Sequence, residues 1–265
     1  MKRRNLWMSP DAQPLFSGLG LVMCAAALWA TVGVVTELVP QHSALPRDAY
    51  GFMRTLVAAP AILLLAALGG GLAALRIQAG STAEFFKFGL YCAVFQLCLF
   101  RSFDLLGVTI TVFLTVTLPP LIAIGWAALR GTERLSPHVV FAFLLGASGL
   151  LAFVSADVAG GDPGDMLPGL ALSLGASVAF VLMTQSGRRL AVRHSPLLVS
   201  GLGLLAAAGV LLPVALLSSG LDMRLFAVAL GSWQGAGAVL YLGLVPTALA
   251  YVCYCSGMAR CQSAT

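Results

Sequence analysis

Long apolar runs separated by short polar segments dominate the pattern along this chain of 265 residues. A helix that crosses a bilayer needs about 20 predominantly apolar residues, because each residue adds about 1.5 Å of rise. Runs of this length recur along the whole sequence. The pattern therefore predicts eight membrane-spanning helices, at 16–38, 51–74, 86–106, 109–129, 138–155, 167–186, 196–218 and 234–257.

Two of these spans have alternatives. Only two residues separate the third span from the fourth, so one long kinked helix over 86–129 is the alternative there. Lys2, Arg3 and Arg4 precede the first apolar run in the manner of a signal peptide. That run is longer than the roughly 7–15 apolar residues of a signal-peptide core, so we expect an uncleaved first helix.

The composition indicates the same class of protein. Hydrophobic residues make up 59% of the chain and charged residues only 9%, whereas a soluble domain is about 25% charged. Such a composition excludes a soluble domain, a disordered chain and a nucleic-acid-binding protein. The six cysteines include no CxxC pair, so we expect neither a disulfide framework nor a metal site, and no cofactor. The fold class is an all-α polytopic membrane protein embedded in the lipid bilayer.

The basic residues predict the orientation in the membrane. One side of the predicted bundle collects 11 of the 15 basic residues, the other collects Arg47 and Arg224, and Arg54 and Arg101 fall within spans. Basic residues accumulate in cytoplasmic loops. We therefore expect both termini in the cytoplasm, and the Ala-, Leu- and Gly-rich sequence suggests a bacterial inner membrane.

Two stretches of the chain resemble each other. Gly18–Trp29 and Gly169–Phe180 each place a glycine at the entry and an aromatic residue eleven positions later. The offset predicts a duplication, with a first repeat of five helices over 1–155 and a second repeat of three helices over 156–265. Because five is odd, the second repeat enters the membrane inverted, as in many secondary transporters. Two helices would then be absent, in a fragment or in a naturally short chain.

Four short stretches occur in a recognisable order. They are Ala27-Leu-Trp-Ala-Thr-Val-Gly33, Gly51-Phe-Met-Arg54, Leu118-Pro-Pro120 followed by Gly131-Thr-Glu-Arg-Leu-Ser136, and Thr247-Ala-Leu-Ala-Tyr251. In their order and spacing the chain resembles the EamA-type families of the drug/metabolite transporter superfamily over nearly its whole length. It departs from them by the inserted Thr132, by two adjacent prolines where one is usual, and by the absence of the last two of ten helices.

The resemblance implies a ten-helix inverted repeat, five plus five, around a central cavity. It also implies a secondary transporter, not an enzyme, that exports or exchanges small metabolites such as amino acids by alternating access. Two alternatives stay open: a non-transporting remnant or subunit, and an integral membrane enzyme. A homodimer, or a partner that supplies the absent helices, also stays open.

Neutral polar and aromatic side chains lie near the middle of several predicted spans. Such groups suit a small polar ligand, although Ser and Thr also bond between packed helices without any ligand. Together with one arginine they are the candidate cavity residues: Trp29, Arg54, Gln96, Thr115, Thr117, Ser177, Thr247 and Tyr251.

Charged residues inside or beside spans form a second set of candidates. Arg54 would bind a substrate carboxylate or pair with Glu37, or else extend to the interface. Arg101 and Asp104 share a helix face, and with Glu37 they are candidates for a gate or for simple interfacial ion pairs. Pro119 and Pro120 lack backbone N–H groups and would form a hinge or a static bend.

Overall fold

The computed structural model describes residues 12–38, 46–131 and 163–263, together with scattered positions between 137 and 152. The described chain is helical, and six of its helices are long and apolar enough to cross a membrane. This confirms the prediction of an all-α polytopic membrane protein. Only scattered positions of the predicted span 138–155 are described, and these are helical.

The helices follow the predicted spans closely, with shifted ends. α1 covers Ala12–Leu38 and α2 covers Arg47–Gly70, so the second span begins before its predicted start and ends earlier. The remaining elements are η2 (Leu72–Leu75), α3 (Thr82–Leu129), α5 (Pro163–Ala191), α6 (Pro196–Ser218), α7 (Met223–Gly231), α8 (Trp233–Gly243), the π-helical segment η4 (Leu244–Leu249) and α9 (Ala250–Ser263).

Local chemistry explains several of these ends. Ser195 caps α6, because its side chain accepts a hydrogen bond from the Leu198 N–H, and Pro196 occupies the first turn, where a missing N–H costs nothing. Ser232 caps α8 in the same way. Gly71 ends α2 with a positive φ of 63°, a conformation that glycine adopts without strain.

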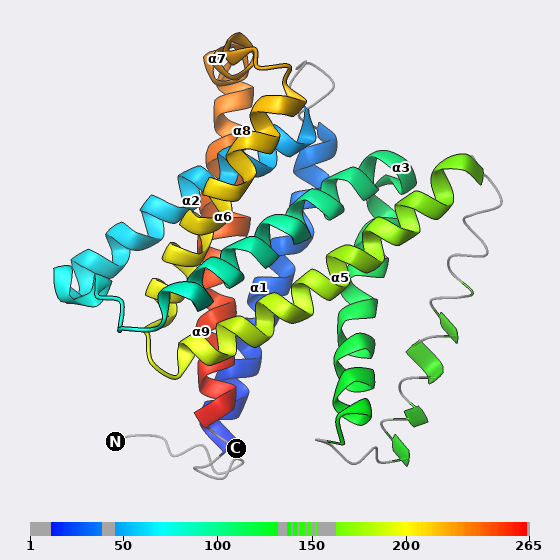
Figure 1. Cartoon of the computed structure of the whole chain (residues 1–265), viewed down its shortest axis with the longest axis vertical. Helices are drawn as coiled ribbons and strands as arrows, with labels where there is room; N and C mark the ends of the chain where they lie inside the picture. Colours follow the sequence, from blue (N-terminus) through cyan, green and yellow to red (C-terminus); the bar gives the residue numbers. More distant parts are fainter. Residues whose placement is uncertain are drawn as a thin grey trace, which may run out of the picture.

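α3 is two helical arms joined at Gly107, whose φ of 75° and ψ of 167° are not helical. The hydroxyls of Ser102 and Thr111 lie 2.9 Å apart, whereas nine residues of straight helix would separate them by about 13.5 Å. The chain therefore reverses at Gly107, as Figure 1 shows. We call residues 82–106 the first arm of α3 and residues 108–129 its second arm.

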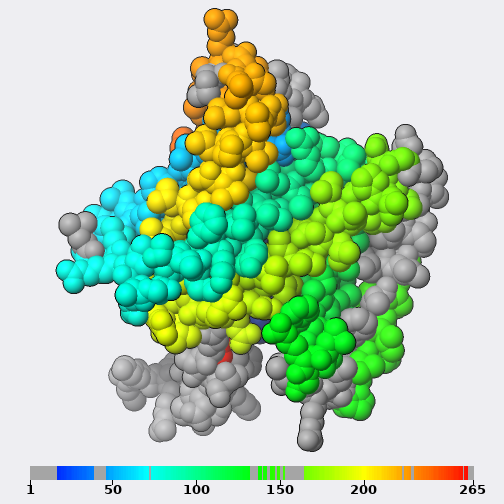
Figure 2. Space-filling model, viewed as in Figure 1, coloured from blue at the N-terminus to red at the C-terminus, as the bar shows by residue number. Residues whose placement is uncertain are grey.

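Small residues allow the helices to approach closely. α1 packs antiparallel against α9 (Figure 1), and a Cβ added to Gly257 would meet the Gly18 carbonyl oxygen at 2.7 Å. α3 packs against α5 and α6, which with it cover the face seen in Figure 2. Such contacts between small residues are characteristic of helices packed within membranes.

The bundle has two chemically different ends. The basic end is where α1 begins and α9 ends, and its described basic side chains are Arg76, Lys87, Arg130, Arg188, Arg189, Arg193 and Arg260. The acidic end is where α1 ends and α2 begins. It holds Glu37, Asp48 and Asp104 with two arginines that pair with them.

Candidate functional site

A buried arginine lies at the centre of the bundle's polar interior. Arg54 on α2 is only 6% exposed. Its Nε and Nη2 both donate to the Oε1 atom of Gln96 on the first arm of α3, at 3.0 and 2.7 Å. The guanidinium also lies 5.2 Å from the centre of the Phe100 ring, within the range of a cation–π interaction.

Phe100 can lie there because α2 has no side chain at Gly51. A Cβ added to Gly51 would be 2.6 Å from Cε2 of Phe100. The glycine therefore lets the ring pack directly on the α2 backbone, one turn before Arg54. The packing of α2 against the first arm of α3 thus holds the arginine in place.

Hydrogen bonds extend from Gln96 to a third helix. Its Nε2 donates to Thr55 Oγ1 at 3.2 Å and reaches Cys92 Sγ at 3.7 Å. Cys92 Sγ lies 3.1 Å from the hydroxyl of Tyr251 on α9. We call Arg54, Thr55, Cys92, Gln96 and Tyr251 the Arg54 cluster. It joins α2, α3 and α9 and is buried throughout.

The π-helical segment η4 lies directly before Tyr251. Pro246 within it has no N–H to donate, and Thr247 Oγ1 donates to the carbonyl of Leu242, five residues earlier, at 2.6 Å. A π turn inserts one extra residue into a helix. It therefore changes the face on which every residue after it lies, Tyr251 included.

Aromatic rings surround the Tyr251 end of the cluster. Trp29 on α1 packs against Tyr251, Tyr254 and Phe180, with ring centres 5.5, 5.2 and 5.9 Å away. Phe180 comes from α5 and Tyr254 from α9. We call these four residues the aromatic cluster. It brings together one side chain from the first predicted repeat and three from the second.

A cavity of about 500 Å³ lies on the other side of the aromatic cluster, between the second arm of α3, α5 and α9. Phe180 and Tyr254 form part of its wall, and Thr184 bonds to the Tyr254 hydroxyl at 2.7 Å. Arg130 and Arg188 line it toward the basic end. The cavity thus combines apolar surface with a few polar groups, the usual lining of a small-molecule site.

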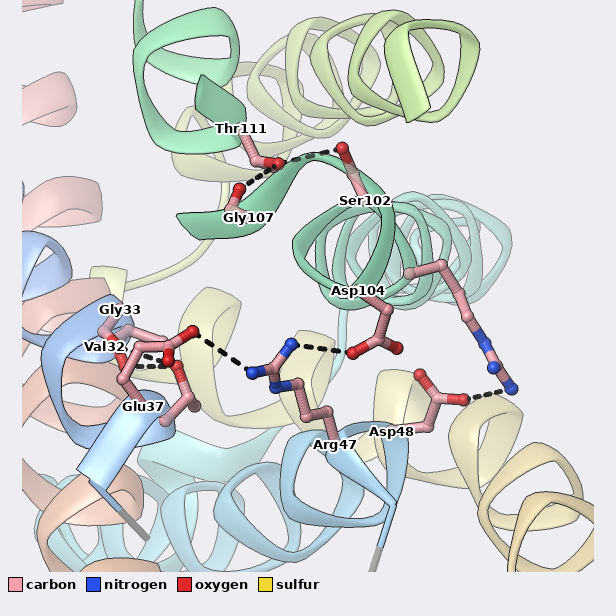
Figure 3. A network of polar contacts seen from close by, with 11 residues as sticks. Val32, Gly33, Glu37, Arg47, Asp48, Ser102, Asp104, Gly107 and Thr111 are labelled. Atoms are coloured by element: carbon pink, nitrogen blue, oxygen red, sulfur yellow. Dashed lines mark hydrogen bonds and ion pairs between the residues drawn. The ribbon is translucent and has the colours of Figure 1, made fainter. Parts of the chain in front are cut away.

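Ion pairs join three helices at the acidic end (Figure 3). Arg47 donates to Asp104 at 2.7 Å and to Glu37 at 3.1 Å, which links α2 to α3 and to α1. Asp48 lies 2.7 Å from Arg101. Arg101 and Asp104 therefore pair with α2, and Glu37 pairs with Arg47 where the sequence had suggested Arg54. We call these five residues the ion-pair cluster.

The remaining predicted cavity residues lie apart from Arg54. Thr115 donates to the Thr111 carbonyl and Ser177 to the Ser173 carbonyl, both at 2.8 Å and within their own helices. Thr117 is half-buried on the second arm of α3. Pro119 and Pro120 line the cavity, and the helix continues through them.

Sequence reasoning missed several members of these groups. Cys92 was missed, although it lies four residues before the candidate Gln96 and therefore shares its helix face. That spacing was the available signal for Cys92. Thr184 and Asp48 gave no such signal, because their partners Tyr254 and Arg101 are distant in sequence. The loop at Glu133, Arg134 and Ser136 lies outside the described residues.

Known proteins resemble this chain in sequence and in fold. It is 26% identical to the uncharacterized transporter YwfM of Bacillus subtilis (strain 168) over 243 residues, which cover 89% of this chain and 75% of that protein. A protein of known crystal structure superposes with a TM-score of 0.66 at 24% identity, covering 92% of this chain and 79% of that one. That likeness shows the fold alone.

The family itself is shown by a match to a family sequence profile. Residues 16–155, more than half of the chain, match the sequence profile of the EamA-like transporter family. This agrees with the six membrane-spanning helices and with a relative that is itself named a transporter. These findings point to a transporter and not to an enzyme. The chain belongs to the EamA-like transporter family and is a multi-pass membrane transporter.

Proposed function

We propose that this chain is a secondary transporter that exports or exchanges small polar metabolites, amino acids among them, across a bacterial cytoplasmic membrane by alternating access. The observation that carries the proposal is the cavity of about 500 Å³ between α3, α5 and α9. Its volume is in the range of about 300–1,000 Å³ that small-ligand sites occupy. Its wall includes Phe180 and Tyr254 of the aromatic cluster.

The distribution of charge supports an orientation for this cavity. Basic residues accumulate on the cytoplasmic side of membrane proteins, so the basic end faces the cytoplasm and both termini lie there. Arg130 and Arg188 line the cavity toward the basic end, which supports a cavity on the cytoplasmic side of the aromatic cluster. At the acidic end, the ion-pair cluster ties α1, α2 and α3 together. The structure is then an inward-facing state, and outward opening breaks those ion pairs.

The predicted repeats supply the moving parts of this mechanism. Residues 1–155 form one repeat and residues 156–265 belong to an inverted second repeat, which rock about the central site. The aromatic cluster is one of the places where they meet, because Trp29 contacts residues of α5 and α9 there. A small motion at this contact would connect the cavity with the Arg54 cluster.

The test is counterflow in proteoliposomes that contain the purified chain and a panel of labelled amino acids and organic acids. Ala123 lines the cavity on the second arm of α3, and Ala123→Trp should abolish flux by filling it. Val116 lies on the same arm, is 68% exposed and does not line this cavity, so Val116→Trp is the matched control and should retain flux.

Two results would contradict the proposal. Flux equal to that of protein-free vesicles across the whole panel would mean that this chain is not a transporter of such solutes. Full flux with Ala123→Trp would mean that solute does not pass through this cavity. Equal amounts of both tryptophan variants in the vesicles, checked by protein content, exclude poor reconstitution as the cause of a lost flux.

A further inference from the structure

In the part of the chain that the structure describes, the charge of Arg54 has no anionic partner. None of the ion pairs among the described residues involves this side chain. Its hydrogen-bond partner Gln96 is neutral, and Phe100 offers only the face of a ring. Elsewhere on the same helix, Arg47 pairs with two carboxylates. Of the two arginines on α2, the buried one is therefore the one without a counter-charge among the described residues.

Burial of the Arg54 guanidinium without a counter-charge lowers the stability of the fold. Removing a charged group from water costs several kcal/mol unless an opposite charge or a full set of hydrogen bonds compensates. Extension of the side chain to the membrane surface is excluded by its 6% exposure and by its bonds to Gln96. Ionisable residues retained inside a membrane protein characteristically bind a substrate or an ion.

We propose that Arg54 binds the carboxylate of the transported solute, an inference that rests on the proposed transport function. The planar guanidinium presents two parallel N–H groups that match the two oxygens of a carboxylate. In the present structure Nε and Nη2, which form such a pair, are both occupied by the single amide oxygen of Gln96. Gln96 holds the place that the solute takes.

The residues between the cavity and Arg54 indicate a route by which the solute reaches the arginine. Arg54 does not line the cavity, and the aromatic cluster lies between them. The hydroxyl of Tyr251 contacts Cys92 in the interior and also donates to Met183 Sδ at 3.7 Å, and sulfur atoms are weak hydrogen-bonding groups. Movement of Tyr251 away from Cys92 opens the route. The faces of Trp29 and Tyr251 then suit the ammonium group of a zwitterion.

The test measures the thermal unfolding midpoint of the purified full chain with matched solutes. The probes are L-alanine and L-lactate, which carry a carboxylate, and L-alaninamide and ethylamine, which do not; further carboxylate–amide pairs extend the panel. At roughly ten times its dissociation constant, a bound carboxylate should raise the wild-type midpoint by about 3–5 °C. The amides and amines should leave it unchanged.

Variants separate binding from folding. Arg54→Met should lose the carboxylate-induced shift while its unliganded midpoint equals or exceeds that of the wild type, because an uncompensated buried charge is gone. A residue with only a structural role would lower that midpoint. Arg54→Lys keeps the charge without the planar pair of donors and should retain a smaller shift. Arg76→Met removes an exposed arginine and should keep the full shift.

The outcomes distinguish this inference from the proposed function. If no carboxylate in the panel shifts the midpoint, or if Arg54→Met retains the shift, the carboxylate site is wrong. If vesicles exchange amides or amines as fast as carboxylates, the chain is a transporter but Arg54 does not select its solute. If no solute exchanges at all, the proposed function fails first.

Discussion

Two arginines on one helix show how position decides the role of a charge. Arg47 and Arg54 are seven residues apart on α2, and two helical turns bring them to the same face. Arg47 lies in the ion-pair cluster between Glu37 and Asp104, whose side chains are 50% and 45% exposed. Arg54 is buried and bonds to a neutral amide. Only about 10 Å of helix separates the two environments.

The comparison shows which charged side chains can be explained by their contacts in the fold alone. Exposed ion pairs need no further explanation, because their charges remain in contact with water. Water also screens the attraction between them, so they contribute little to stability. A buried guanidinium without a counter-charge opposes folding and requires another explanation. Binding of solute supplies one for Arg54. The two clusters should therefore respond to mutation in different ways.

The largest effect on stability should come from Gln96. Gln96→Leu removes the acceptor of both Arg54 hydrogen bonds and leaves the buried charge with only its contact to the Phe100 ring among the described residues. Hydrogen bonds to charged groups are worth about 1.5–3 kcal/mol, so we expect a loss of about 2–3 kcal/mol in the free energy of unfolding. Denaturant titration of the purified chain measures it.

A double variant provides the control for this prediction. Arg54→Leu combined with Gln96→Leu removes donor and acceptor together and should recover most of the loss. A loss in the double variant as large as that of Gln96→Leu alone would mean that the two side chains act independently, which their hydrogen bonds contradict.

The next effect concerns the helix packed behind Arg54. A Cβ added to Gly243 on α8 would lie 2.7 Å from Val57 and 3.0 Å from the Arg54 carbonyl oxygen. Gly243→Ala should cost about 1–3 kcal/mol, because a close-packed interface resists an added methyl group. Gly237 on the same helix has no atom within 4 Å of such a Cβ, so Gly237→Ala should gain about 0.5 kcal/mol. Equal effects would contradict tight packing around Arg54.

A smaller effect should follow loss of Arg101. Asp48, its partner, is 3% exposed, so Arg101→Gln leaves a buried carboxylate without its ion pair. We expect a loss of about 1–2 kcal/mol, measured by the same denaturant titration. Arg224→Gln, at an exposed arginine of the same end, is the control and should change stability little.

The smallest effect belongs to the exposed pairs. Asp104→Asn should cost about 0.2–1 kcal/mol, and the cost should shrink as salt is added, because salt screens exposed charges. The measurement compares unfolding midpoints of wild type and variant at low and high salt. A cost above that of Gln96→Leu would reverse the proposed contrast between the two clusters.

The sequence predicted the helices better than their contacts. Apolar runs predicted the positions and order of the long helices in the described residues, but not the short helix α7. Gly107 separates the third and fourth spans where the sequence left one kinked helix as an alternative. Arg54, Gln96, Tyr251 and Trp29 were all candidates from their place within spans. Periodicity says nothing of which helices meet, so the bond from Arg54 to Gln96 could not be foreseen. The π turn at η4 also rotates Tyr251 in a way that no simple helical period describes.

The most direct test of the central claim is counterflow by wild-type proteoliposomes with solutes that differ only at the carboxylate. Vesicles loaded with each carboxylate of the panel, and with its amide, are compared for uptake of the same labelled solute. We predict that at least one carboxylate drives uptake and that its amide drives it at least about tenfold less, the factor that corresponds to roughly 1.4 kcal/mol. Equal uptake with every carboxylate and its amide would contradict the assignment of Arg54 as the site that binds the solute.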